Sequence, residues 1–140
     1  MECQVSWLGN GSMAFSAKTG SGHLVKMDGP PEVGGQNSAP RPMELILAGT
    51  GGCSAFDVVL ILQRAKQAIS ACDLKLTAER AEVDPKVFTR INLHFTVRGK
   101  DLDRAKVERA VKLSHDKYCS ATSMLAKTAE ITYSIDIVSE

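Results

Sequence analysis

The feature that most constrains this chain is an apolar stretch over residues 42 to 66, PMELILAGTGGCSAFDVVLILQRAK. From Leu45 to Leu62, its only charged residue is Asp57. Pro42 suits the first turn of a helix, and Glu44 suits the positive end of the helix dipole. The stretch therefore predicts one long helix that is apolar around nearly its whole circumference and is buried on all sides.

The same stretch is long enough for a membrane span. However, the glycines and polar residues in its middle lower the hydropathy at the point where a span is usually purest. The first residues, MECQVSWLG, lack the basic start and apolar core of a signal peptide. We therefore interpret the helix as the core of a soluble protein.

Gly51 and Gly52 are poor helix formers, so we expect a kink or a restart of the helix directly before Cys53. A cysteine in the first turn of a restarted helix has a lowered thiol pKa, because free amides and the dipole stabilise the thiolate. The alternative is an inert cysteine that serves as a small apolar residue. Asp57, one turn later, would oppose ionisation unless it has its own basic or hydrogen-bonding partner.

Length and charge limit the class of protein. A chain of 140 residues fits a single domain over residues 1 to 140. The net charge is +1 without a basic cluster, so neither nucleic acid nor an anionic membrane is an expected partner. Four scattered cysteines without a CxxC pair and without a signal peptide indicate a reducing cytoplasm.

The chain before the central helix predicts a meander of three short strands within the first 27 residues. Its turns are expected at Gly9-Asn10-Gly11 and at Thr19-Gly20-Ser21. Residues 28 to 42 contain four of the five prolines and three glycines, which predicts a loop. The length of this loop makes it a candidate flap or dimer contact.

After the central helix, the pattern predicts two strands, two helices and one strand. The clearest strand has Ile91, Leu93, Phe95 and Val97 on one face and polar residues on the other. Asp101 or Asp103 can cap the next helix, a short helix follows over residues 118 to 126, and the last strand alternates from Ile131 to Ile137.

This order predicts an α+β fold with mainly antiparallel sheet. A single six-stranded sheet would cover one side of the central helix. A second copy of the chain would cover the other side in an isologous, intertwined dimer.

Two segments carry a family resemblance: PMELILAGTGGCSAFDVV around Cys53, and HDKYCSATSML around Cys119. Together with the order of elements, they resemble the OsmC/Ohr family of osmotically inducible and organic hydroperoxide resistance proteins. The resemblance implies an OsmC-like fold, with sheets around two central helices in an intertwined homodimer and with active sites at the subunit interface.

The resemblance also implies a chemistry for the two cysteines. Cys53 would attack the peroxide oxygen, become a sulfenic acid and then form a disulfide with Cys119. A dithiol reductant such as a lipoylated protein would reopen this disulfide, and no bound cofactor is expected.

The chain departs from the pattern of the Ohr branch at three places. That branch has a glutamate directly after the helix-starting proline, which holds a thiolate-activating arginine; here Met43 stands at that position and Glu44 follows. No arginine precedes Arg41, so Arg41 or Lys18 is the candidate cation. Ser120 follows the second cysteine, where relatives often have proline.

The first hypothesis is a thiol-dependent peroxidase for organic hydroperoxides in oxidative-stress defence. Its candidate catalytic residues are Cys53, Cys119, Glu44 and Arg41. Its candidate substrate pocket consists of Met43, Leu47, Phe56, Asp57, Tyr118 and Met124, which are mostly apolar and suit an alkyl group.

The second hypothesis is a non-catalytic dimer of the same fold that senses oxidation or binds a small apolar ligand. The departures at Met43 and Ser120 favour it.

A third interpretation is a zinc site, because His115 and Cys119 are one helical turn apart and Cys53 could add a ligand. Since the sequence has no second close ligand pair, we expect no metal.

Overall fold

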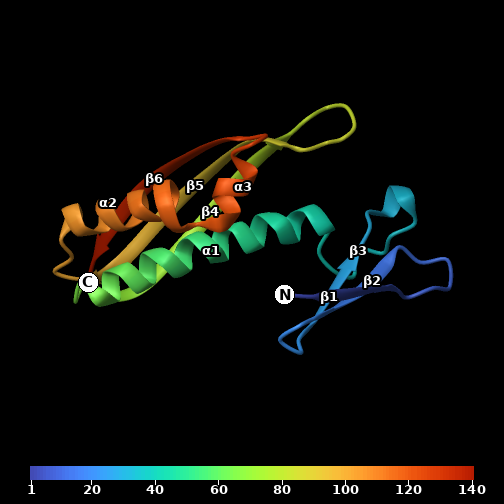
Figure 1. Ribbon diagram of the computed structural model, residues 1–140, viewed down its shortest axis with the longest axis horizontal. Coiled ribbons are helices and arrows are strands. Elements are labelled where there is room, and N and C mark those ends of the chain that lie inside the picture. Colours follow the sequence, from blue (N-terminus) through green and yellow to red (C-terminus); the bar gives the residue numbers. More distant parts are fainter. The chain divides into compact units, whose positions relative to one another are not determined.

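The computed structural model describes all 140 residues and confirms the predicted order of strands and helices (Figure 1). The chain forms two compact units, Met1–Leu47 and Ala48–Glu140. Helix α1 (Pro42–Arg64) begins in the first unit and continues into the second.

The first unit contains the predicted meander. Strands β1 (Cys3–Trp7), β2 (Ala14–Thr19) and β3 (Leu24–Asp28) form an antiparallel sheet in the order β1-β2-β3. The turn between β1 and β2 has positive φ at Gly9, Asn10 and Gly11, as expected for residues that tolerate the left-handed region. Both predicted turns are therefore confirmed.

The loop after β3 is organised around the buried carboxylate of Asp28. One oxygen accepts the backbone N–H of Gly29 at 2.8 Å. The other accepts the N–H of Gln36 at 3.1 Å, and both the N–H and the hydroxyl of Ser38, at 3.0 and 2.7 Å. The loop also contains the short 3-10 helix η1 (Pro31–Val33). The proline-rich segment is thus a loop with a fixed conformation.

The second unit contains strands β4 (Ala68–Arg80), β5 (Phe88–Lys100) and β6 (Glu130–Ser139) in the order β4-β5-β6. β4 and β5 are antiparallel, whereas β5 and β6 are parallel. The expectation of a single six-stranded sheet is therefore wrong, because the strands form two three-stranded sheets. The expectation of mainly antiparallel sheet is confirmed, because β5 and β6 form the one parallel pair. The helices between β5 and β6 form the long crossover that a parallel pair requires.

The core of the second unit lies between its sheet and its helices, which cover one face of the sheet (Figure 1). The predicted inner face of β5 is confirmed, since Ile91, Leu93, Phe95 and Val97 are all buried. The helices contribute buried apolar residues to the same core: Val58 and Leu62 from α1, and Val107, Ala110 and Val111 from α2 (Arg104–Leu113).

Helix α1 is continuous through its glycines, so the predicted restart before Cys53 is wrong. Gly51 is buried, and a Cβ atom at this position would lie 2.6 Å from Cδ1 of Leu76 on β4. The glycine therefore allows close packing of α1 on the sheet and does not end the helix. Cys53 consequently lies in the interior of α1, away from any free helix N-terminus.

One side of α1 is exposed in the single chain. Burial on all sides was expected together with a second copy of the chain and stays a prediction. Phe56 is 69% exposed. It belongs to a shallow, mainly apolar groove lined by Gly52, Ala55, Phe56, Val59, Leu60 and Gln63. By length and composition alone, α1 could cross a membrane, but a core helix of a soluble protein meets the same criterion.

Candidate functional site

The candidate site lies where the middle of α1 meets the segment after α2. Asp103 caps α2 as predicted, accepting the N–H of Ala105 at 2.9 Å. After α2, the π-helical turn η2 (Ser114–Tyr118) leads into the short helix α3 (Ser120–Leu125). The N–H of Cys119 donates to the carbonyl of Ser114 at 2.9 Å. This wide turn directs both Ser114 and Cys119 towards α1.

Serine hydroxyl groups connect α1 with η2 and with Cys119. The hydroxyl of Ser114 lies 3.0 Å from Oδ2 of Asp57 and 3.3 Å from the carbonyl oxygen of Ser54. The hydroxyl of Ser54 donates to Sγ of Cys119 at 3.2 Å. The partner that Asp57 requires is therefore a serine hydroxyl rather than a basic side chain.

Cys119 is only 2% exposed and caps the N-terminus of α3. Its Sγ lies 3.5 Å from the backbone N of Thr122, which donates to it. The hydroxyl of Thr122 donates to the carbonyl oxygen of Cys119 at 3.1 Å, which fixes the first turn of α3. The sulfur is thus surrounded by hydrogen-bond donors in a buried position.

Cys53 and Cys119 are brought together, although 66 positions separate them in the sequence. Their side chains are hydrogen-bonded to each other, and both thiols are free. Cys53 is half-buried and also accepts a hydrogen bond from the backbone of Ala121. The pair therefore has one buried and one partly accessible sulfur.

The two thiols differ in their tendency to ionise. Burial raises the pKa of Cys53, and the negative charges of Cys119 and Asp57 raise it further. Burial acts against ionisation of Cys119 as well, but hydrogen bonds from Ser54, Thr122 and the Cys53 thiol outweigh it and lower the pKa of Cys119. The expectation of a lowered pKa at Cys53 is therefore wrong in the isolated chain, because α1 provides no free amides at that position.

Glu44 and Arg41 make local contacts in the first unit. Oε2 of Glu44 accepts the backbone N–H of Arg41 at 2.9 Å, so the carboxylate caps the start of α1. The guanidinium of Arg41 donates to Oδ1 of Asn37 at 2.5 Å. Met43 and Leu47 are half-buried in the same unit. The predicted roles of these four residues at the thiols remain predictions.

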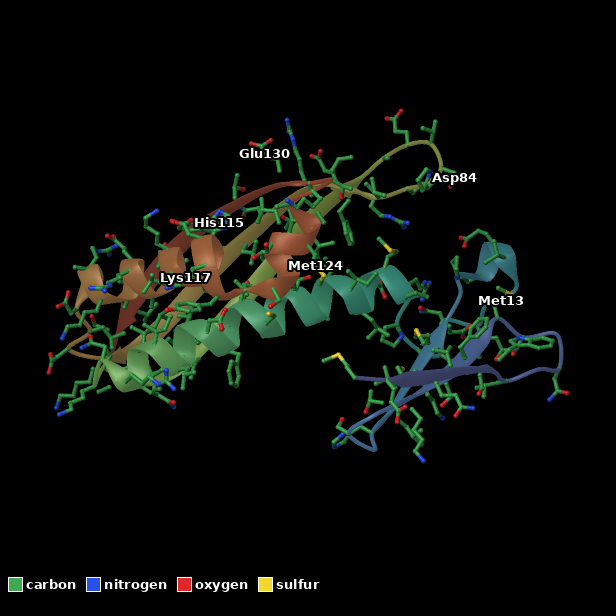
Figure 2. The ribbon with its side chains drawn as sticks, in the orientation of Figure 1. Met13, Asp84, His115, Lys117, Met124 and Glu130 are labelled. Carbon is green, nitrogen blue, oxygen red and sulfur yellow. The ribbon has the colours of Figure 1, made fainter.

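The remaining predicted pocket residues lie in the second unit, where Asp57 is half-buried and the other three are exposed. Met124 projects from α3 and is 69% exposed (Figure 2). Tyr118 is also exposed and has the amine of Lys117 at 5.2 Å from its ring centre. With Phe56 equally exposed on α1, the chain alone does not enclose an apolar substrate at these three side chains.

The predicted metal ligands do not form a site. No group of three or more His, Cys, Asp and Glu side chains is placed to bind a metal ion. His115 instead contacts Tyr133 edge to face, with ring centres 5.1 Å apart.

Three polar residues at the site were not identified from the sequence: Ser54, Ser114 and Thr122. All three are buried and hydrogen-bonded. The available signal was a serine directly after Cys53 in a mainly apolar helix. Its partners lie 60 and 65 positions away, so the sequence pattern could not reveal its role.

Comparison with known proteins identifies the family. The model of the OsmC family, described as OsmC-like protein, matches residues 35–134. The chain therefore belongs to the OsmC family. It is also 47% identical over 138 residues to Protein YhfA from Escherichia coli K12, covering 99% of this chain and 98% of YhfA. The predicted family resemblance is confirmed.

Solved structures agree with the OsmC-like fold. One structure from structural genomics has a TM-score of 0.90 at 46% identity and covers 100% of both chains. An organic hydroperoxide resistance protein OsmC from Legionella pneumophila has a TM-score of 0.67 at 17% identity and covers 97% of both chains. The second likeness concerns the fold alone. The predicted α+β, OsmC-like class is confirmed.

Proposed function

We propose that this protein reduces organic hydroperoxides with the thiols of Cys53 and Cys119. Family membership indicates a redox role in peroxide resistance. The observation that carries the proposal is the hydrogen-bonded pair of free thiols, one partly accessible on α1 and one buried at the start of α3. A peroxidatic thiol must meet the substrate, whereas a resolving thiol must only reach its partner.

In the proposed cycle, Cys53 attacks the terminal peroxide oxygen. The O–O bond breaks, the alcohol leaves with the thiol proton, and Cys53 becomes a sulfenic acid. Cys119 then attacks that sulfur, a disulfide forms and water leaves. An external dithiol, for example a lipoylated protein, exchanges with the disulfide and restores both thiols. No resident cofactor takes part.

The decisive experiment compares hydroperoxide consumption by the reduced protein and by two variants. Cys53→Ser is expected to abolish consumption, because it removes the nucleophile. Cys119→Ser is expected to permit one oxidation per chain and then stop, because the sulfenic acid has no resolving partner. Mass spectrometry of the wild-type protein should detect a disulfide between Cys53 and Cys119. Unchanged consumption by Cys53→Ser would contradict the proposal.

We also propose that residues 1 to 140 act as one OsmC-like domain in a homodimer with its active sites at the subunit interface. The exposed apolar groove of α1 supports the dimer, because a second chain seated there would remove its apolar side chains from water. In such a dimer, a second chain would complete the substrate pocket at Phe56, Tyr118 and Met124. A reducing compartment such as the cytoplasm would keep the thiols free.

A second function is favoured by the raised pKa of Cys53, which reduces the fraction of reactive thiolate. The same dimer would then sense oxidation, or bind a small apolar ligand, without turnover. Stopped-flow oxidation by cumene hydroperoxide separates the two functions. Rapid, selective loss of two thiols per chain with dithiol turnover supports the enzyme. Slow oxidation by every peroxide, with a ligand retained in native mass spectrometry, supports the binding protein.

A further inference from the structure

We propose that the open edge of β6 and the adjacent face of α2 form a docking groove for an extended acidic peptide, which adds to the second sheet as a further strand. This surface lies outside the thiol pair, so its role goes beyond the proposed function. Three features of the second unit support it: the exposed edge of the strand, the groove beside that edge and the charge of α2.

β6 is an edge strand, because the strand order of its sheet is β4-β5-β6. It pairs with β5 over its whole length without a register shift. Its ten residues, EITYSIDIVS, contain no proline, lysine or arginine. Proteins usually protect a free edge with such residues, with bulges or with a covering segment. A long and regular edge, rich in β-branched residues, is therefore available to a further strand.

The backbone of Tyr133 and Ile135 faces this open edge. The N–H of Glu140, directly after β6, donates to the carbonyl oxygen of Gly99 on β5. Successive residues of a strand direct their N–H and C=O groups alternately to its two edges, and the register with β5 is unbroken. Tyr133 and Ile135 therefore present their N–H and C=O groups away from β5, as pairing with an added strand requires.

α2 lies beside β6 (Figure 1), and an open groove runs between them. Tyr133 and Ile135 line it from β6 and are half-buried. The lining residues of α2 share one face of the helix: Ala105, Glu108, Arg109 and Lys112. An added strand directs every second side chain into such a groove. Main-chain hydrogen bonds would then provide affinity, and the groove would select the alternate side chains.

The groove contains a cation that has no ionic partner within the chain. Lys112 is paired with Asp116, and Glu108 is paired with Arg104. Arg109 is exposed and takes part in no ion pair. A guanidinium group binds a carboxylate through two parallel hydrogen bonds. The groove therefore favours a peptide that directs acidic side chains towards α2.

A second copy of the chain suits this edge less well than an acidic peptide. α2 contains four basic residues and one acidic residue: Arg104, Lys106, Arg109 and Lys112 against Glu108. If two β6 strands paired around a two-fold axis, the two α2 helices would approach each other on the same face of the joined sheet. Like charges across an interface oppose association. Charge complementarity thus selects the acidic peptide.

The probe for the test is a fluorescently labelled peptide, Thr-Glu-Thr-Val-Thr-Glu-Thr. Its glutamates and its valine share one face of a strand, so they can enter the groove together. The valine would cover the apolar side chain of Ile135, and a glutamate would meet Arg109. Threonine favours the extended conformation. The control peptide has lysine in place of both glutamates.

Fluorescence anisotropy with the reduced full chain measures the affinity. The glutamate peptide should bind saturably, and the lysine peptide should not. Arg109→Glu should weaken binding about fivefold or more, because it removes an exposed ion pair and adds a repulsion. Lys106→Glu is the matched control, since it makes the same charge change on α2 outside the groove. At physiological ionic strength, it should change the affinity less than about twofold.

Two further measurements separate strand addition from simple attraction of charges. Methylation of alternate backbone nitrogens of the peptide blocks one of its two edges, so one methylated version should lose binding and the other should keep it. Amide hydrogen exchange followed by NMR should show that the peptide protects the N–H groups of Tyr133 and Ile135.

No saturable binding of the glutamate peptide, or an unchanged affinity in Arg109→Glu, would overturn the proposal. Equal binding of the two methylated versions would also overturn it, because an added strand uses one edge. Protection of the Tyr133 and Ile135 amides by self-association, without peptide, would assign the edge to a second copy of the chain and overturn the acidic peptide as its occupant.

Discussion

Ser54 and Asp28 are buried polar residues whose partners lie elsewhere in the chain. Ser54 contacts Cys119 across 65 positions, and Asp28 collects donors from Gln36 and Ser38 in its own loop. A buried polar group costs free energy unless its hydrogen bonds are satisfied. The polar groups of both side chains have hydrogen-bond partners. Ser54 holds the sulfur of Cys119 near α1, and Asp28 holds the loop before α1.

The carboxylate of Asp28 is expected to contribute to stability in a pH-dependent manner. Hydrogen bonds from Ser38, Gln36 and Gly29 lower its pKa from 3.8 to about 2. Because the folded-state pKa lies below the ordinary value, the contribution is present above pH 3.8 and is lost as the pH falls through about 2.

The matching experiment is thermal unfolding of wild type and Asp28→Asn between pH 7 and pH 2. Asp28→Asn should have the lower Tm at neutral pH and a weaker decline of Tm in acid, since the titrating group is gone. Asp84→Asn, in the exposed loop between β4 and β5, is the control and should resemble wild type (Figure 2). Parallel Tm curves for wild type and Asp28→Asn would contradict the assignment.

At the scale of elements, the sequence was sufficient for the order and type of strands and helices. The alternation of Ile91 to Val97 and the cap at Asp103 are local signals, and both are confirmed. Strand pairing is not local. The parallel return of β6 beside β5 depends on how the intervening helices pack, and the sequence pattern of β6 is the same for either direction.

The glycines of α1 illustrate the same limit. By propensity they predict a break, yet the helix continues because Gly51 packs against Leu76. At the site, the family pattern was sufficient to pair Cys53 with Cys119, which the structure brings together, and their catalytic roles stay predictions. It could not reveal Ser54, Ser114 and Thr122, whose roles depend on the contact of α1 with η2 and α3.

The packing of α1 on β4 leads to a prediction for Gly51→Ala. Alanine is the better helix former, but its Cβ would lie 2.6 Å from Cδ1 of Leu76, so the leucine must move. We expect a net loss of about 1–3 kcal/mol in the free energy of unfolding, which is typical of overpacking. Leu76→Val shortens the obstructing side chain, so the loss should be smaller in that background. Urea unfolding of the four proteins measures this coupling, and a stabilising Gly51→Ala in the Leu76 background would refute the close contact.

At the scale of the whole molecule, the chain alone leaves two features incomplete. The apolar groove of α1 is open, and three of the side chains expected to line a substrate pocket, Phe56, Tyr118 and Met124, are exposed. A partner chain seated on α1 would address both, because it would bury the groove and enclose the space near the thiols. Membership of the OsmC family makes a second copy of the same chain the economical partner.

The dimer can be tested by placing a charge in the groove of α1. Phe56→Glu places a carboxylate at a position that is 69% exposed in the isolated chain, so the variant should fold. If a second chain covers Phe56, burial of the unpaired charge opposes association. Sedimentation should then change from a dimer to a monomer of 15.1 kDa. Val83→Glu is the matched control, since Val83 is 75% exposed and lies outside the groove, and this variant should remain dimeric.

A Phe56→Glu protein that is still dimeric would exclude the groove as the interface. Loss of peroxide turnover together with the dimer would place the complete active site at that interface.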